Sequence, residues 1–440
     1  STASPGSPAS SPLASAPPDP VPWRYEVHYT RGDLQVEARF GPGTTGVLHV
    51  DPDASPYVRD LTEAKDGQAR VVRYRFALRE AAEKLMDVDT AYASGGVFVA
   101  PPSTWLVRPD TEPAGAFRMH VTTEAPDRFA AGTHPSVDGA PDTYQAPAAD
   151  LDDTSFAVFG PAHVQTVESG ASRVLLASAP QGLALSDAEI LAWGHFAVDA
   201  IAGYLRRPFP VARSLVVLVK GGPGSTRGET LGEGGPAVLV RAGEGVTAAT
   251  TRDDWVMTHE LIHVVMPSLT HEHVWLSEGI PSYVEPVARV RLGTLRRETM
   301  WHDLVEGMPQ GLPEAGDEGL EKTHTWGRTY WGGALFCLMA DVRIREKTAN
   351  ARSFDDVVRA VVATGADVES NWDIGRVLDV GDAATGTRVL HDLYAEMALA
   401  PGTVDLPATW RSLGVTVHDG NVTFDETAPL AAVRRGIETR

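Results

Sequence analysis

The segment from Trp255 to Glu285, WVMTHELIHVVMPSLTHEHVWLSEGIPSYVE, constrains this 440-residue chain more than any other. It places four histidines and four glutamates among residues that are otherwise typical of a buried core. Burying strongly polar side chains is costly unless they are paired or bind a metal. The segment therefore predicts a metal site.

Residues 259–263, HELIH, match the pattern His-Glu-x-x-His. On an α-helix His259 and His263 leave the same face one turn apart. A tetrahedral Zn²⁺ could therefore take one nitrogen from each at about 2.0–2.1 Å. Glu260 lies one step round the helix, beside the metal, where it can take a proton from a water molecule on the metal. The alternative is two histidines of a helix surface or core with no metal role.

The helix that carries this motif has plausible start and stop signals. Thr251 is the predicted N-cap, with Asp254 at the third position, and Pro267 is expected to mark the end. The pattern therefore predicts that His259 and His263 lie on one helix between about Thr251 and Pro267, which is called the metal helix below.

The identity of the third metal ligand distinguishes one class of zinc protease from another. A glycine three residues after the motif and a histidine three further on would indicate another class of zinc protease, and neither is present. His271 and His273 remain candidates, but they precede VWLSEG, which is better interpreted as the start of a second helix. Glu278 on that helix is 15 residues after His263, which leaves room for an antiparallel return. We favour Glu278, because a His₂Glu set leaves the fourth zinc position open, as catalysis requires.

The remainder of the chain predicts an α+β multidomain fold. Residues 1–22 are almost all Ser, Ala and Pro and predict a disordered tether. Residues 23–180 contain short alternating runs separated by Gly, Pro and Asp, which indicate an N-terminal all-β domain. Residues 181–345 hold a helix that begins with a Ser186–Glu189 capping box, two strands and the metal helix, an α+β catalytic domain. Residues 346–440 predict a mostly helical C-terminal domain.

Within these domains the candidate elements can be placed by residue range. The expected strands are 23–29, 34–40, 69–78, 96–100, 117–123, 155–160, 172–179, 214–220 and 237–243. The expected C-terminal elements are helices at 353–364 and 386–400 and a hairpin at 415–424 with Asp419-Gly420 at its turn.

Charge and composition exclude some partners and indicate a location. With 38 basic and 58 acidic residues the net charge is −20, which makes nucleic acid an unfavourable partner. No apolar run approaches the roughly 18–20 residues that a transmembrane helix needs. The tether is typical of exported proteins (periplasmic, secreted, or held by an N-terminal lipid or surface anchor), with a cytosolic protein as the alternative. The single cysteine, Cys337, is expected to be a buried, inert thiol.

Seen together, HELIH and WLSEGIPSYVE resemble the gluzincin zinc metallopeptidases. The chain is most similar to the glycyl aminopeptidase family, relatives of the leukotriene-hydrolase-type aminopeptidases. Their signature joins the zinc helix to Trp-x-x-Glu-Gly, here Trp275, Glu278 and Gly279, and to a later Tyr-x-x-Gly, here Tyr330 and Gly333. The ending TAPLAAVRRGI also resembles that family. A PDZ module, common in the family, is not evident.

The resemblance implies a thermolysin-like catalytic domain that hydrolyses peptide or protein substrates. It implies one Zn²⁺ per chain on His259, His263 and Glu278, and Glu260 as general base. It also implies that Tyr330 donates its hydroxyl to the oxyanion, with an aromatic packed at a helix start as the alternative. An inactive peptide-binding relative is a third alternative, against which the retained Glu260 argues.

The chain departs from the family where the substrate amine is held. Related aminopeptidases use a glutamate of a Gly-x-Met-Glu-Asn or Gly-Leu-Glu-His strand, and residues 221–243 match neither pattern. Glu229 or Glu233 are the candidate substrate-binding residues, with a solvated glycine-rich loop as the alternative. The sequence therefore predicts a zinc peptidase, an aminopeptidase first and an endopeptidase of altered specificity second.

Overall fold

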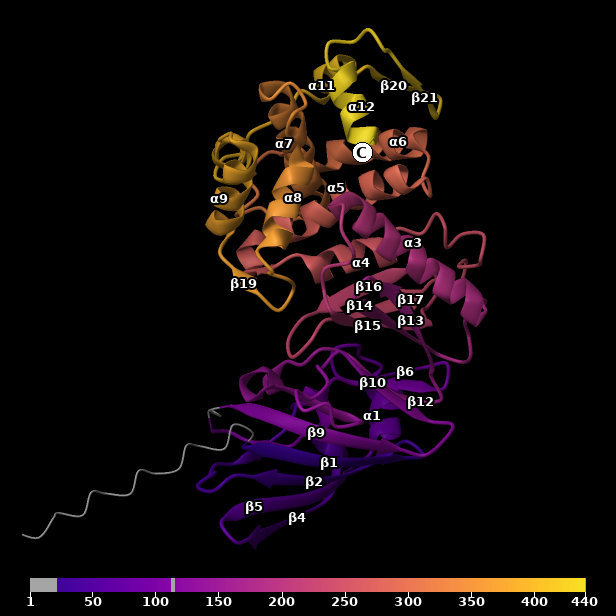
Figure 1. Cartoon of the computed structure of the whole chain (residues 1–440), viewed down its shortest axis with the longest axis vertical. Helices are drawn as coiled ribbons and strands as arrows, with labels where there is room; N and C mark the ends of the chain where they lie inside the picture. The colour runs from indigo at the N-terminus through magenta and orange to yellow at the C-terminus, as the bar shows by residue number, and fades with distance from the viewer. Residues whose placement is uncertain (1–21, 112–114, 440) are drawn as a thin grey trace, which may run out of the picture.

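The computed structural model describes residues 22–111 and 115–439, so the predicted tether at 1–22 lies outside the described residues except for Pro22. The described chain passes from a β-rich N-terminal part through a mixed α/β part to a helical C-terminal part (Figure 1). The two ends of this path lie at opposite ends of the long axis (Figure 1). No helix among the described residues is long and apolar enough to cross a membrane.

The N-terminal part is built on a six-stranded sheet in the order β11-β9-β1-β2-β5-β4. Side chains along each strand point alternately to the two faces of the sheet. In β1 the side chains of Trp23, Tyr25, Val27 and Tyr29 are buried, and the residues between them are more exposed. Its strands are β1 (Trp23–Thr30), β2 (Asp33–Phe40), β4 (Val58–Asp66), β5 (Ala69–Phe76), β9 (Ala116–Thr123) and β11 (Thr143–Pro147). The alternating runs thus predicted four of its strands, β1, β2, β5 and β9, whereas β4 and β11 were not predicted.

The all-β description of the N-terminal part needs correction. Two short helices, α1 (Leu78–Leu85) and α2 (Pro102–Trp105), lie among its strands. Both are too short for a helical period to stand out from the sequence. The remaining strands are a four-stranded sheet of β6 (Tyr92–Ser94), β7 (Val97–Val99), β10 (Arg128–Ala131) and β12 (Ala157–Gly160), and a pair of β3 (Leu48–His49) and β8 (Arg108–Pro109).

A five-stranded sheet in the order β13-β14-β15-β17-β16 forms the centre of the chain. Strands β14, β15 and β17 are parallel, whereas β16 is an antiparallel edge strand. Leu215 and Val217 of β15 pack with Val97 and Val99 of the N-terminal part, while Val216 and Leu218 face the helices. Burial on both faces explains the unbroken apolar run. The strands are β13 (His163–Ser169), β14 (Ser172–Ser178), β15 (Arg213–Lys220), β16 (Arg227–Leu231) and β17 (Ala237–Ala242).

The helix before β15 follows its sequence signals closely. Helix α3 (Asp187–Leu205) begins at the predicted capping box, in which Ser186 and Glu189 bond to each other's backbone amides. The predicted cap of the metal helix is wrong: α4 (Val256–Val265) begins after Trp255, and the carboxylate of Asp254 accepts from the Val256 amide. Thr251 instead lies in a preceding turn, where its hydroxyl donates to the carbonyl of Ala248.

Helices dominate the rest of the chain. The predicted 386–400 helix is only partly present: α10 (Val389–Leu393) passes into a π-helical turn at Tyr394–Ala398. The hairpin of β20 (Val415–His418) and β21 (Asn421–Phe424) turns at Asp419-Gly420 as predicted. The other elements are α5 (Val274–Leu292), α6 (Arg297–Gly307), α7 (Gly333–Lys347), α8 (Phe354–Ala363), α9 (Ile374–Thr385), α11 (Leu406–Leu413), α12 (Ala431–Glu438), β18 (Ser268–Leu269) and β19 (Asn371–Trp372).

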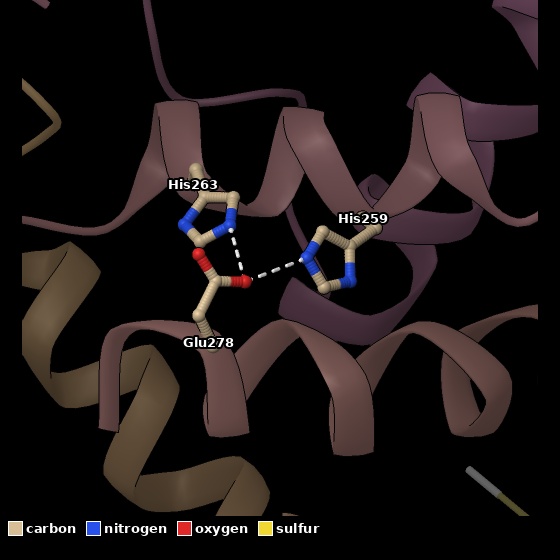
Figure 2. A group of neighbouring side chains, drawn as sticks. All are labelled: His259, His263 and Glu278. Carbon is tan, nitrogen blue, oxygen red and sulfur yellow. Dashed lines mark hydrogen bonds and ion pairs between the residues drawn. The ribbon is translucent and has the colours of Figure 1, made fainter. Parts of the chain in front are cut away.

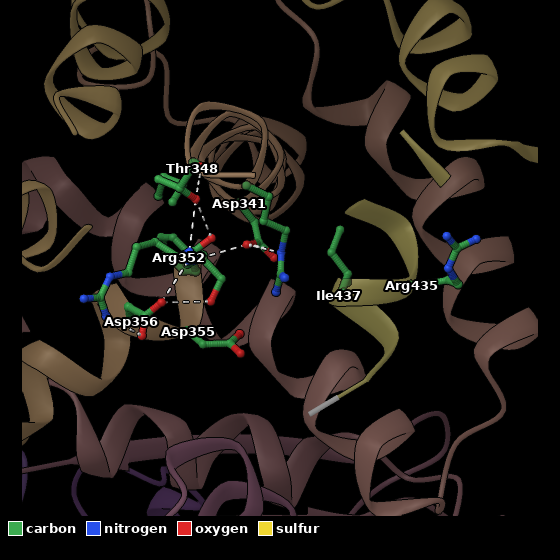
Figure 3. A network of polar contacts seen from close by, with 12 residues as sticks. Asp341, Thr348, Arg352, Asp355, Asp356, Arg435 and Ile437 are labelled. Carbon is green, nitrogen blue, oxygen red and sulfur yellow. Dashed lines mark hydrogen bonds and ion pairs between the residues drawn. The ribbon is translucent and has the colours of Figure 1, made fainter. Parts of the chain in front are cut away.

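A buried polar network joins helices α5, α7 and α8. Asp341 of α7 accepts hydrogen bonds from the Tyr283 hydroxyl of α5, from Arg345 Nε and from the Phe354 amide at the start of α8. Burial raises the pKa of Asp341, and the three donors offset the cost of burying its carboxyl group. Figure 3 shows Asp341 with Asp355 of α8, whose negative charge also raises the pKa of Asp341. The network fixes α5 and α7 against each other.

The same helices share one apolar core, which contains residues from both sides of the predicted boundary at 345/346. Cys337 lies in this core, fully buried as predicted, and burial raises the pKa of its thiol. The proposed domain boundaries themselves stay predictions.

Candidate metal centre and active site

Two helices bring three metal-binding side chains together. His259 and His263 extend from one face of α4 toward Glu278 of α5 (Figure 2). Glu278 Oε2 lies 3.2 Å from His259 Nε2 and 3.5 Å from His263 Nε2. Among the described residues, these three are the group whose ligand atoms all lie within 4.8 Å of one another.

Glycine contacts set how closely the helices approach. Gly279 follows Glu278 in α5 and lies directly against Gly333, the first residue of α7. A Cβ at Gly333 would overlap the carbonyl of Trp275, and a Cβ at Gly279 would overlap the backbone of Gly333. The two glycines of the sequence signature therefore allow the helix after Tyr330 to pack on the helix that carries Glu278.

The electrostatics of the cluster favour an anionic carboxylate beside two imidazoles. Burial raises the pKa of Glu278, but His263 and His259 outweigh this effect and hold its pKa well below the usual range. Burial likewise lowers the pKa of His263, and the charge of Glu278 more than reverses it. Glu278 is thus charged at neutral pH, as a metal ligand must be.

The donor set fits zinc. A tetrahedral ion with ligands at about 2.0–2.1 Å has ligand atoms roughly 3.3–3.4 Å apart, and the two nitrogen–oxygen distances of 3.2 and 3.5 Å bracket that value. Two imidazoles and one carboxylate are also a donor set found in catalytic zinc sites, which keep a fourth position open. These three residues would hold the ion.

The alternative third ligands lie elsewhere. His273 is buried outside the cluster, with its Nδ1 2.8 Å from Glu321 Oε2. His271 is exposed and lines the neighbouring cleft, but it is outside the cluster of ligand atoms.

Glu260 lies beside the cluster and is held from the sheet edge. Thr230 of β16 has its hydroxyl 2.7 Å from Glu260 Oε2 and 3.1 Å from the Glu260 carbonyl oxygen, so it can donate to either. Gly228 of the same strand lies flat against the Glu260 side chain, where any Cβ would overlap it. A glycine in a strand often marks such a close approach. The edge strand therefore fixes the side chain of Glu260.

Tyr330 lies on the other wall of the site. It belongs to a π-helical turn, Arg328–Gly332, that leads directly into α7, and such turns are frequent at functional sites. Burial, followed by the negative charges of Glu278 and Glu260, raises the pKa of Tyr330 to about 12. The phenol is therefore protonated at neutral pH and can donate a hydrogen bond.

We expect the Tyr330→Phe variant to lose about 10²–10³ in kcat, the scale of one oxyanion donor. Zinc content and thermal stability should stay near those of the wild type, because no hydrogen bond of the Tyr330 hydroxyl to another described residue is lost. Steady-state kinetics with metal analysis would check this. A loss below about threefold would show that Tyr330 is a packing residue.

A cleft of about 1050 Å³ contains the cluster, and its lining includes Glu260, Glu229 and Tyr330. The glycine-rich loop expected at residues 221–236 is in fact interrupted by β16, which places Glu229 on the cleft wall. Glu233 is not among the residues that line this cleft; its backbone carbonyl accepts from the Ser155 amide.

Glu229 faces a carboxyl group from the N-terminal part. Burial, followed by repulsion from Asp89 and a hydrogen bond with it, raises the pKa of Glu229 to about 7. Asp153, also from the N-terminal part, lines the same cleft. Sequence reasoning missed Asp89, Asp153 and Thr230, because no local pattern links residues that only the packing of two sheets brings together.

No protein-family model and no curated protein matches the sequence, but solved structures match the fold. One is an aminopeptidase N family protein from Idiomarina loihiensis, at 13% identity and a TM-score of 0.68, covering 90% of this chain and 79% of that one. Another is an M1 zinc metallopeptidase from Deinococcus radiodurans, at 15% identity and a TM-score of 0.50, covering 87% and 96%. The chain has the fold of the M1 zinc metallopeptidases. The β-rich start and the helical C-terminal part of the chain are consistent with this multidomain fold.

Proposed function

We propose that the protein is a zinc metallopeptidase that cleaves residues from the free amino end of peptides. The observation that carries the proposal is the convergence of His259, His263 and Glu278 in a cleft that also presents Glu260 and Tyr330. We further propose one Zn²⁺ per chain, a thermolysin-like arrangement of the catalytic part, and kinship with the glycyl aminopeptidases. An exported location is supported by the composition of residues 1–22.

The side chains divide the chemistry among them. Zinc bound by the three ligands would lower the pKa of a water molecule to about 7 and polarise the scissile carbonyl. Glu260, fixed by Thr230, accepts the proton that the attacking water loses and returns it to the leaving amine. The Tyr330 hydroxyl donates to the carbonyl oxygen as that oxygen becomes negative.

The carboxyl groups of Glu229 and Asp89 support cleavage from the amino end. Two carboxyl groups in hydrogen-bond contact cannot both be ionised without a cation or a shared proton between them. A peptide ammonium supplies that cation, and Glu229 presents its carboxyl in the same cleft as Glu260. An internal segment of a longer chain has no α-ammonium group to place there.

Acetylation of the substrate tests the choice between exo- and endopeptidase. We expect a free tripeptide to be cleaved at least about tenfold faster, in kcat/KM, than its N-acetylated form, because acetylation removes a charge-assisted contact worth roughly 1.5–3 kcal/mol. Glu229→Gln should remove most of this difference, and Glu233→Gln should not. Equal cleavage of both peptides by the wild type would favour the endopeptidase alternative.

The pair of Glu229 and Asp89 also predicts that KM depends on pH. Glu229 takes up a proton as the pH falls through about 7, so the ammonium loses its partner and KM for the free peptide should rise on the acidic side. Zinc would lower this pKa, which places the rise at or below pH 7. The effect should be absent in Glu229→Gln; an unchanged acidic limb in that variant would assign the titration to another group.

A further inference from the structure

The ten tryptophans of the chain are distributed unevenly between core and surface. Seven have exposed fractions of 8% or less and Trp331 is partly buried. The two that remain exposed are Trp255, at 49%, and Trp326, at 62%. Both line the cleft that contains the metal cluster. The other exposed large hydrophobic residues among the described part of the chain do not line it: Val47, Leu61, Met86, Val137, Val164 and Leu399.

Each exposed ring touches a residue of the reaction centre. The centroids of the Trp255 and His259 rings lie 5.2 Å apart in an edge-to-face arrangement. The Trp326 ring lies 5.7 Å from the Tyr330 ring with the two planes tilted by 33°. Each indole is thus fixed on one side by a metal ligand or by the oxyanion donor, while much of its surface faces solvent.

The cleft that both rings line also contains apolar side chains. Apolar residues from the β18 and α5 regions contribute to the same cleft: Met266, Pro267, Leu269, Val274, Ile280 and Pro281. Exposed aromatic surface next to an apolar wall gains free energy when a ligand covers it, through area burial and through ring stacking. Carboxylate side chains would gain neither from this wall.

We propose that Trp255 and Trp326 are specificity-determining residues that stack against large apolar, preferably aromatic, side chains next to the scissile bond. This inference rests on the proposed peptidase function and deepens it. A residue flanking the scissile bond lies beside the metal ligands and the oxyanion donor, so its side chain can reach the indole that touches either. The enzyme therefore selects peptides by ring-sized apolar side chains close to the cut.

Matched peptides test the inference. Tripeptides with Ala or Phe before the scissile bond, and with Ala or Phe after it, give two Phe-to-Ala ratios of kcat/KM. We expect wild-type ratios above one at one or both positions, and a fall on the order of tenfold in Trp255→Ala or Trp326→Ala at the position that each ring contacts. Trp326→Phe should retain most of the preference. Leu399→Ala, an exposed apolar residue outside the cleft, should leave both ratios unchanged.

Binding gives a second readout that does not need turnover. In a Glu260→Gln background, calorimetry with the same Phe and Ala peptides should show the same ratio of affinities and the same loss in the tryptophan variants. If the wild type cleaves peptides but both tryptophan variants keep their ratios within twofold, the inference fails and the peptidase proposal stands. If the wild type cleaves none of these peptides and binds none, the peptidase proposal itself fails.

Discussion

The His259→Ala variant is expected to be purified without zinc and without peptidase activity. Removal of one of three ligands leaves an imidazole and a carboxylate, which is too few for a stable catalytic zinc site. Metal analysis should find about one zinc per wild-type chain and close to none in the variant. A chelator should reproduce the loss in the wild type, and added zinc should restore activity there but not in the variant.

His302→Ala is the matched control for this experiment, because His302 is a partly exposed histidine on α6 outside the metal cluster. It should keep both zinc and activity. A wild-type chain that carries no zinc, or a His259→Ala variant that retains full activity, would end the proposal of a zinc enzyme.

The Glu260→Gln variant should retain zinc and lose about 10²–10⁴ in kcat, the range of a positioned general acid–base group. Glutamine has the same shape, and its amide oxygen can still accept from Thr230, so the fold and the cleft should be preserved. KM should change little, because Glu260 acts on the attacking water and not on the bound peptide. Zinc content and thermal unfolding, measured beside the kinetics, separate a catalytic loss from a structural one.

Unchanged turnover in Glu260→Gln would place the base on another residue. Loss of zinc in this variant would instead show that Glu260 supports the ligands. Neither result would alter the assignment of His259, His263 and Glu278 as the group that holds the metal.

Local patterns were sufficient to predict that His259, His263 and Glu278 lie close together. His259 and His263 share a helix, and Glu278 follows after a turn short enough that α5 must return past α4. Spacing therefore favoured Glu278 over His271 and His273 as the third member of the group before any tertiary contact was known. Four strands of the N-terminal sheet were predictable for a similar reason, since alternation of apolar and polar residues indicates which residues face the core. Strand β4 is almost entirely exposed and lacks this alternation, so it was not predicted.

The substrate end of the cleft could not be predicted in this way. Gly228 lowers the strand propensity of β16, and it is there because the backbone must pass close to Glu260. Asp89 meets Glu229 only because the N-terminal part packs beside the central sheet. The exposed position of Trp326 is likewise a property of the folded surface, whereas composition alone favours a buried indole.

The contact between Gly279 and Gly333 sets the distance between helices α5 and α7, and with it the relative positions of Glu278 and Tyr330. A methyl group at either position would wedge α5 and α7 apart and carry the phenol away from the cation, while both imidazoles on α4 kept their places. We expect a relative with alanine at either position to have lost the alignment between its tyrosine and its metal ligands, because Glu278 and Tyr330 lie on opposite sides of this contact.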